Sequence, residues 1–329
     1  MKRIAIGISL VFAVLILASF IVGQPPTAGE PVQAAENGAP PLSNPLKVAL
    51  LKWYAGNFVY TTFPVGIQPR GVAFDGANIW VANNMSSTLT KIRANDGAVI
   101  GTFVAGQRPV GLAFDGANLW VGTEFGDQLT KVRASDGKPL GAFRVGNAPF
   151  YPAFDGQNIW VPNISDGTIS VLRASDGSTV RTITTGGAEA AAFDGNYMWV
   201  TGTPGNTVTR FRRDGSSAGS FPVGYGPTGV AFDGASVWVA NYESGTVTKL
   251  RATDGSVLGT FNVPSPTQIA FDGEAIWVVS QDTGVVFELR PSDGVQLHVF
   301  GAAVSPAGIA FDGANVWVAA TGSNIVYKF

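Results

Sequence analysis

An all-β, seven-bladed β-propeller of four-stranded antiparallel blades is the fold that the sequence predicts, on three observations. The triplet Phe-Asp-Gly occurs seven times at intervals of 39 or 40 residues, beginning at Phe74, Phe114, Phe154, Phe193, Phe232, Phe271 and Phe311. A tryptophan follows each Phe six residues later, from Trp80 to Trp317. A second Asp-Gly follows in six of the seven units. Repeats of about 40 residues containing four short apolar runs are typical of propeller blades.

The first unit shows how one repeat divides into four strands. Its apolar or alternating runs cover residues 71–74, 79–82, 88–93 and 99–104. Asp75-Gly76 and Asp96-Gly97 separate two pairs of these runs. Asp-Gly provides the positive φ angles that tight hairpins need, so we interpret both dipeptides, and the Phe and Trp beside them, as structural.

The seventh unit stops at Phe329, after its third strand, and the missing strand is predicted at the other end of the repeat region. Residues 58–66 align with 99–106 when Phe63 is matched to Phe103. The sequence therefore predicts that the N-terminal strand closes the last blade, which leaves no open seam in the ring.

Three segments are predicted: 1–23, 24–45 and the propeller at 46–329. Lys2 and Arg3 precede an apolar run over 4–22, which is typical of a cleaved signal peptide and equally of a retained membrane anchor. Both interpretations stay open. In both, the propeller is exported, and it is periplasmic, extracellular or anchored to the outer side of the cytoplasmic membrane. The Pro-, Ala- and Gly-rich segment 24–45 is interpreted as a flexible linker.

The composition argues against several classes of function. Charged residues make up 13% of the chain and the net charge is -2, with no basic run that would bind nucleic acid. The absence of cysteine excludes disulfides, thiolate nucleophiles and Cys-ligated metals. We expect a monomer that meets a membrane only through its N-terminal segment.

The element Pro-x-Gly-x-Ala-Phe-Asp-Gly-x-x-x-Trp-Val, at residues 69–81 and 306–318, resembles the YVTN and NHL-type propeller repeat families and the virginiamycin B lyase family. These relatives include lyases, lactonases, cell-surface proteins and binding scaffolds, so the resemblance implies a fold rather than an activity. The lyase family relies on a pair of histidines, a glutamate and a divalent metal. This chain has one histidine, His298, which aligns with Gly259 in the outermost strand of its blade. We therefore expect that chemistry to be absent.

The candidate site lies at the channel mouth, where the loops entering the first strands meet the loops leaving the second strands. The residue after the repeated Pro varies between blades, as Arg70, Val110, Phe150, Glu189, Thr228, Thr267 and Ala307. Together with the next position and the second-strand loops, this gives eleven candidate ligand-binding residues: Arg70, Asn83, Glu124, Phe150, Tyr151, Asn163, Glu189, Asn241, Tyr242, Gln268 and Gln281.

Three functions follow from these residues. The first is an exported, non-enzymatic scaffold that binds a protein, peptide or glycan at the channel mouth. The alternative is a Ca²⁺-dependent lyase or lactonase-like hydrolase, because Ca²⁺ accepts oxygen ligands alone and Glu124, Glu189, Glu243 and Asp282 are available. No other cofactor is expected, and no catalytic residue is assigned, since His298 is misplaced for a triad. The third is a structural spacer in the cell envelope.

Overall fold

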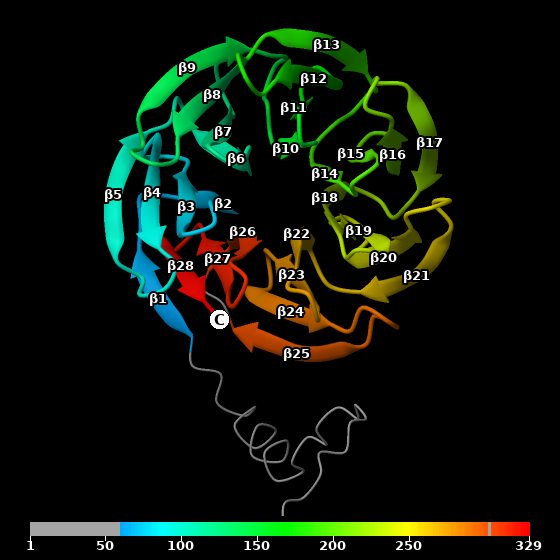
Figure 1. Ribbon diagram of the computed structural model, residues 1–329. Helices are drawn as coiled ribbons and strands as arrows, with labels where there is room; N and C mark the ends of the chain where they lie inside the picture. The colour runs from blue at the N-terminus through cyan, green and yellow to red at the C-terminus, as the bar shows by residue number, and fades with distance from the viewer. Residues whose placement is uncertain (1–59, 302–303) are drawn as a thin grey trace, which may run out of the picture. The chain divides into compact units, whose positions relative to one another are not determined.

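The computed structural model describes residues 60–301 and 304–329, and its regular structure consists of strands arranged in seven four-stranded antiparallel sheets around one axis (Figure 1). The predicted seven-bladed β-propeller is thereby confirmed. The predicted segments 1–23 and 24–45, and residues 46–59 of the predicted propeller, lie outside the described residues. No helix in the described part of the chain is long and apolar enough to cross a bilayer.

The first four blades follow one another along the chain. Blade 1 comprises β2 (Pro69–Phe74), β3 (Asn78–Asn83), β4 (Thr88–Arg93) and β5 (Val99–Val104). Blade 2 comprises β6 (Pro109–Phe114), β7 (Asn118–Thr123), β8 (Gln128–Arg133) and β9 (Pro139–Arg144). Blade 3 comprises β10 (Ala153–Phe154), β11 (Asn158–Asn163), β12 (Thr168–Arg173) and β13 (Thr179–Thr184). Blade 4 comprises β14 (Ala191–Phe193), β15 (Met198–Gly202), β16 (Thr207–Phe211) and β17 (Ser217–Pro222).

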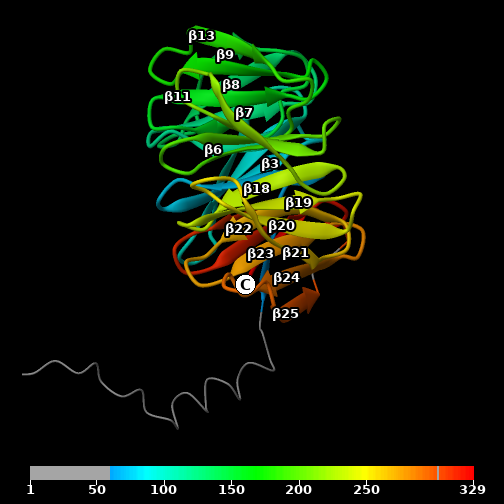
Figure 2. The ribbon, with the colours of Figure 1, turned by 90° about the vertical axis from the view of Figure 1, so that its right-hand side faces the viewer.

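The remaining blades complete the ring. Blade 5 comprises β18 (Pro227–Phe232), β19 (Ser236–Asn241), β20 (Thr246–Arg251) and β21 (Val257–Asn262). Blade 6 comprises β22 (Pro266–Phe271), β23 (Ile276–Ser280), β24 (Val285–Leu289) and β25 (Gln296–Gly301). Blade 7 comprises β26 (Pro306–Phe311), β27 (Val316–Ala320), β28 (Ile325–Lys328) and the N-terminal β1 (Thr61–Pro64). The first strands surround the axis and the fourth strands form the outer rim (Figure 1), with neighbouring blades stacked around the ring in the side view (Figure 2).

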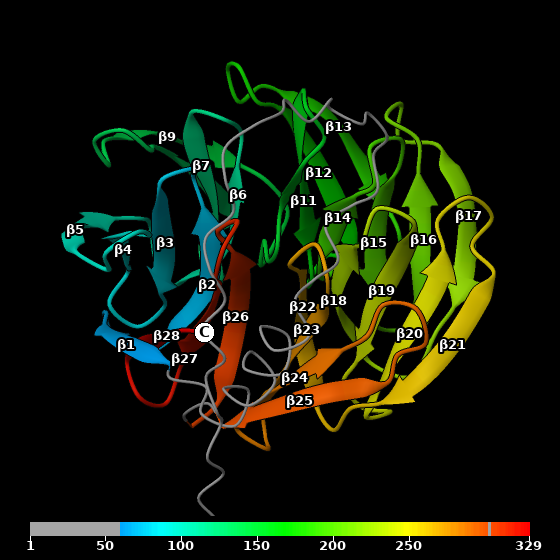
Figure 3. The same ribbon diagram turned by 60° about the horizontal axis from the view of Figure 1, so that its bottom comes forward.

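The N-terminal strand closes the ring as the sequence predicts. Strand β1 pairs antiparallel with β28, and Phe63 lies opposite Val326. Phe103 lies opposite Leu89 at the same place in blade 1, so the alignment of Phe63 with Phe103 is correct. The first strands β26 and β2 of the last and first blades lie side by side (Figure 3).

The Phe-Asp-Gly motif and the tryptophan are linked by a hydrogen bond in every blade. In blade 1, Asp75 Oδ1 accepts hydrogen bonds from the backbone N–H groups of Ala77 and Asn78, and Asp75 Oδ2 accepts one from Trp80 Nε1 at 2.7 Å. The same indole-to-carboxylate bond recurs in the other six blades. A buried indole N–H needs a partner. The aspartate therefore holds the turn and satisfies the core tryptophan together.

The second Asp-Gly packs neighbouring blades together. A Cβ atom on Gly97 would lie 2.0 Å from the ring of Phe63 in the preceding blade, and Gly97 has a φ of 75°. Only glycine satisfies both demands. The same arrangement joins Phe103 to Gly137 and Phe143 to Gly177. The repeated Phe of the fourth strand is thus an inter-blade packing residue.

Candidate ligand-binding site at the channel mouth

A cavity of about 270 Å³ opens at the channel mouth, where the first strands begin and the second strands end. Seven of the eleven candidate residues line it: Arg70, Phe150, Tyr151, Glu189, Tyr242, Gln268 and Gln281. Thr228, Thr267, Ala307 and Thr321 complete its wall. We call this cavity the mouth pocket. Six of the seven blades contribute to it, so the ring closure itself builds the site.

The residue that follows the variable position, which is Gly71 after Arg70 in blade 1, determines how closely the first strands approach each other below the mouth pocket. A Cβ atom on Gly71 would lie 2.1 Å from the carbonyl oxygen of Val110, and one on Gly308 would lie 1.9 Å from that of Arg70. Most first strands therefore approach each other too closely for a side chain. Blades 3 and 6 instead carry Tyr151 and Gln268, which also line a smaller cavity of about 140 Å³ deeper in the channel. These two side chains stand between the mouth pocket and the channel below.

Blades 3 and 4 depart from the regular blade geometry beside the pocket. Tyr151 N–H donates to the carbonyl of Glu189, and Ala191 N–H donates to the carbonyl of Tyr151, both at 3.2 Å. This parallel bridge joins the chain segments just before the short strands β10 and β14. The rings of Phe150 and Tyr151 meet edge-to-face with centroids 5.2 Å apart. The bridge fixes an aromatic pair next to a carboxylate.

Glu189 is the acidic side chain of the pocket. Burial raises the pKa of its carboxyl from 4.5 to about 7, although a hydrogen bond from Thr203 Oγ1 at 2.9 Å favours the ionised form. Burial also raises the pKa of Tyr151 to about 12, with the Arg70 charge lowering it and the Glu189 charge raising it. Tyr151 therefore lies within electrostatic reach of both charged groups and stays neutral.

Four of the eleven candidates lie outside the mouth pocket. Asn83, Asn163 and Asn241 are fully buried within their blades, where each amide donates to two hydroxyl groups of the adjacent third strand. Glu124 lies in the loop after β7, where it forms an ion pair with Arg108 at 3.3 Å and accepts a hydrogen bond from Asn84.

Strand alternation explains why the three asparagines lie outside the pocket, although it does not explain Glu124, which lies four residues after Trp120. The three buried asparagines lie three residues after the tryptophan of their blades, whereas Tyr242, Gln281 and Thr321 lie four residues after it. Successive side chains of a strand point to opposite sides, so only the fourth position reaches the mouth. Thr321 also lies at this fourth position, so the sequence alone could have identified it as a pocket residue. Thr228, Thr267 and Ala307 occupy the same repeat position as Arg70, but they are small and neutral, so sequence reasoning did not select them.

The residues proposed for a Ca²⁺ site do not gather in the pocket. Of Glu124, Glu189, Glu243 and Asp282, Glu189 alone lines it. Asp282, in the loop after β23, accepts a hydrogen bond from the Tyr242 hydroxyl at 2.8 Å. The described residues contain no group of three or more His, Cys, Asp or Glu side chains placed to hold a metal ion. His298 lies on the outermost strand β25, as predicted from its alignment, and its Nδ1 is 2.7 Å from Glu288 Oε2.

Two larger hollows lie between blades and are weaker candidates. One, of about 560 Å³, is lined by Asp75 and Asn118 among others, and the other, of about 690 Å³, by Asp194 and Asn196. These are turn residues of the repeat, and the two aspartates already bind backbone and indole N–H groups. The mouth pocket differs because its residues vary from blade to blade.

Comparison with known proteins identifies relatives by fold. No protein-family model matches the sequence, and no curated protein matches it. Virginiamycin B lyase from Staphylococcus aureus is similar in structure, with a TM-score of 0.69, 17% identity, and coverage of 82% of this chain and 99% of the lyase. A streptogramin B lyase structure gives a TM-score of 0.71 at 18% identity, covering 83% of this chain and 97% of that one. U3-55K gives 0.73 at 12% identity, covering 82% and 97%. At these identities the likeness shows the propeller fold alone.

Proposed function

We propose that the protein is an exported, non-enzymatic propeller scaffold that binds a peptide segment of a protein partner at the channel mouth. The observation that carries this proposal is a small pocket of about 270 Å³ surrounded by exposed apolar side chains on the same face. Ligand pockets for whole small molecules usually measure about 300–1,000 Å³. The mouth pocket suits one inserted side chain or chain end, with the rest of the ligand lying on the surrounding surface.

The surrounding surface has the composition of a protein-binding face. Five large apolar side chains, from the loops that enter first strands or leave second strands, are about half exposed or more: Ile67, Met85, Phe125, Tyr225 and Val304. Ile67 and Met85 lie together, because Met85 N–H donates to the carbonyl of Ile67. Exposed apolar and aromatic residues around a polar pocket favour a peptide over a purely hydrophilic ligand. Export rests on the charged and apolar pattern of residues 1–23.

Peptide and glycan arrays probed with the full-length chain test the proposal. The variant Ala307→Trp fills the pocket wall, and Val99→Trp adds the same side chain on outer strand β5, where Val99 is exposed. We expect peptides to bind the wild type and Val99→Trp at similar levels, and binding to Ala307→Trp to fall at least tenfold.

Other outcomes contradict the proposal in identifiable ways. Peptide binding that survives Ala307→Trp would move the site away from the mouth. Binding of glycans alone would replace the ligand class. Turnover of a lactone that requires added Ca²⁺ and is lost on chelation would favour the lyase or lactonase-like alternative instead.

A further inference from the structure

The polar groups of the mouth pocket divide into those already engaged and those without a partner. The Thr228 hydroxyl donates to the carbonyl of Thr267 at 2.9 Å, and that of Thr321 donates to the carbonyl of Pro69 at 2.8 Å. Within 60–301 and 304–329, the side chains of Arg70, Gln268 and Gln281 form no hydrogen bond or ion pair. The pocket therefore presents unused N–H donors, while the hydroxyl protons of Thr228 and Thr321 are engaged by backbone carbonyls.

The charges of the pocket are separated rather than paired. Among its described lining residues, Arg70 of blade 1 is the basic one and Glu189 of blade 4 is the acidic one, and they form no ion pair within 4.0 Å. Glu189 is held instead by Thr203. Arg70 is partly buried, and a partly buried guanidinium without an anion has lost some hydration without compensation. An incoming anion would restore that interaction.

We propose that the ligand of the mouth pocket carries an oxyanion group, a carboxylate or a phosphate monoester, which Arg70 binds through its guanidinium while Gln268 and Gln281 donate hydrogen bonds to it. This inference rests on the proposed function and specifies which chemical group enters the pocket. The planar fork of a guanidinium matches both anions in a bidentate geometry. Phe150 and Tyr151 offer an aromatic edge for the atoms that carry the anion.

Glu189 makes this binding depend on pH. Its pKa of about 7 means that it is largely neutral at pH 6 and largely ionised at pH 8. Arg70, Tyr151 and Tyr242 are the other ionisable residues that line the pocket. Burial raises the pKa of Tyr151 to about 12 and the hydrogen bond to Asp282 raises the pKa of Tyr242, so both tyrosines stay neutral over this range. A second negative charge in this partly enclosed pocket opposes an anion. Affinity for the oxyanion therefore falls as pH rises through 7.

Three probes of similar shape test the inference by calorimetric titration of the full-length chain: benzoate, phenyl phosphate and neutral benzamide. At pH 6 we expect at least one anion to bind ten times more tightly than benzamide, and the stronger anion identifies the group. Arg70→Gln should abolish the difference. Arg144→Gln, which removes an exposed arginine from β9, should preserve it. Benzoate carries the same charge at pH 6 and pH 8, so wild-type affinity for benzoate should fall severalfold at pH 8, whereas Glu189→Gln should bind it equally at both values.

Several results would overturn the inference. Equal binding of benzamide and the anions, binding of none of the three, or an unchanged preference in Arg70→Gln each contradict the role of Arg70. A wild-type affinity for benzoate that is the same at pH 6 and pH 8 contradicts the role of Glu189. A neutral peptide that binds strongly and is lost in Ala307→Trp would reject the oxyanion while leaving the proposed function intact.

Discussion

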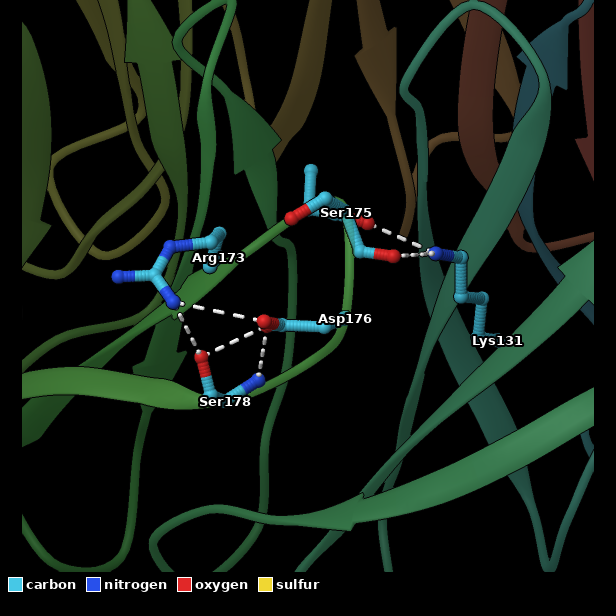
Figure 4. A network of polar contacts seen from close by, with 6 residues as sticks. Lys131, Arg173, Ser175, Asp176 and Ser178 are labelled. Atoms are coloured by element: carbon cyan, nitrogen blue, oxygen red, sulfur yellow. Dashed lines mark hydrogen bonds and ion pairs between the residues drawn. The ribbon is translucent and has the colours of Figure 1, made fainter.

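Five of the seven blade interfaces are closed by a buried or partly buried cation and two are not. In the five, a basic side chain on the third strand crosses to the next blade and donates to backbone carbonyls there. Lys131 Nζ donates to the carbonyl of Ala174 at 2.7 Å and lies 4.7 Å from the centre of the Trp120 ring. It also reaches the carbonyl of Ser175 at 3.4 Å, in the turn that contains Asp176 (Figure 4). We call this arrangement a clasp, and the other members are Lys91, Arg210, Lys249 and Lys328.

The clasp is missing between blades 3 and 4 and between blades 6 and 7. The position eleven residues after the tryptophan is Val171 in blade 3 and Glu288 in blade 6. Val171 is fully buried, and Glu288 faces His298 on its own sheet. These two interfaces therefore hold together by apolar packing, including a contact between the rings of Phe300 in blade 6 and Phe329 in blade 7, whose centroids are 5.3 Å apart.

Whether an interface has a clasp depends on the backbone carbonyl groups that would accept its hydrogen bonds. The clasp carbonyls come from the turn after the third strand of the next blade. In blade 4 this turn is one residue shorter than in blade 3, because Arg212 and Asp214 are separated by one residue whereas Arg173 and Asp176 are separated by two. In blade 7 the fourth strand is β1, so no such turn joins it to β28. A buried cation without acceptors is costly, and the donor is absent where its acceptors are absent or displaced.

Placing a cation in an interface without a clasp should give the largest effect. In Val171→Lys the ammonium group enters a fully buried position whose facing turn is shortened, so we expect the free energy of unfolding to fall by about 3–5 kcal/mol. Urea denaturation measures this. Val171→Met controls for added length and should cost less. Equal losses for the two variants would show that volume, not charge, distinguishes the two kinds of interface.

The interface between blades 3 and 4 carries the partly buried carboxylate of Glu189 instead of a clasp, and its ionisation should weaken the fold. Because the folded-state pKa of Glu189 is raised from 4.5 to about 7, the wild type is favoured at low pH and loses that stability as pH rises through 7. We expect Glu189→Gln to be more stable than wild type at pH 8, by at most about 3 kcal/mol, and similar at pH 4. Melting temperatures across this range measure it, with Glu274→Gln on an exposed turn as the control.

If Glu189→Gln and wild type keep the same stability difference at pH 4 and pH 8, the carboxyl is not desolvated in the folded protein. The pH dependence of ligand binding at the mouth would then lose its cause as well.

Removing a clasp should lower the free energy of unfolding by less than introducing a cation at an interface that has no clasp. Lys131→Met keeps most of the side-chain volume but leaves the carbonyl of Ala174 without its donor, so we expect a loss of about 1–3 kcal/mol in denaturant unfolding. Lys131→Arg is the matched control, since Arg210 performs the same role in blade 4. A fully stable Lys131→Met would mean that packing over Trp120, rather than the hydrogen bond, closes the interface.

Local features made the fold predictable from the sequence. The Asp-Gly turns and the Phe-to-Trp spacing act within a few residues, and Phe63 could be aligned with Phe103 because both face the same kind of glycine. The mouth was predictable in part, since Arg70 and Glu189 stand at a variable repeat position. The side on which Asn83 points was not, because it depends on one residue of strand register. The raised pKa of Glu189 was not predictable either, because the burial of its carboxyl arises from blades that come together only when the ring is formed.

The exposed ion pairs beside the clasps should matter least. Arg133 lies 3.0 Å from Asp136, but both side chains are nearly half exposed, and solvent screens such pairs. We expect Arg133→Gln to leave the melting temperature unchanged at moderate salt. The comparison with Lys131→Met is direct because both residues lie on β8, two positions apart, and Lys131 is buried whereas Arg133 is exposed. A loss in Arg133→Gln as large as that in Lys131→Met would show that charge on this strand stabilises the turn itself, and that the buried clasp is not the special feature of the five interfaces.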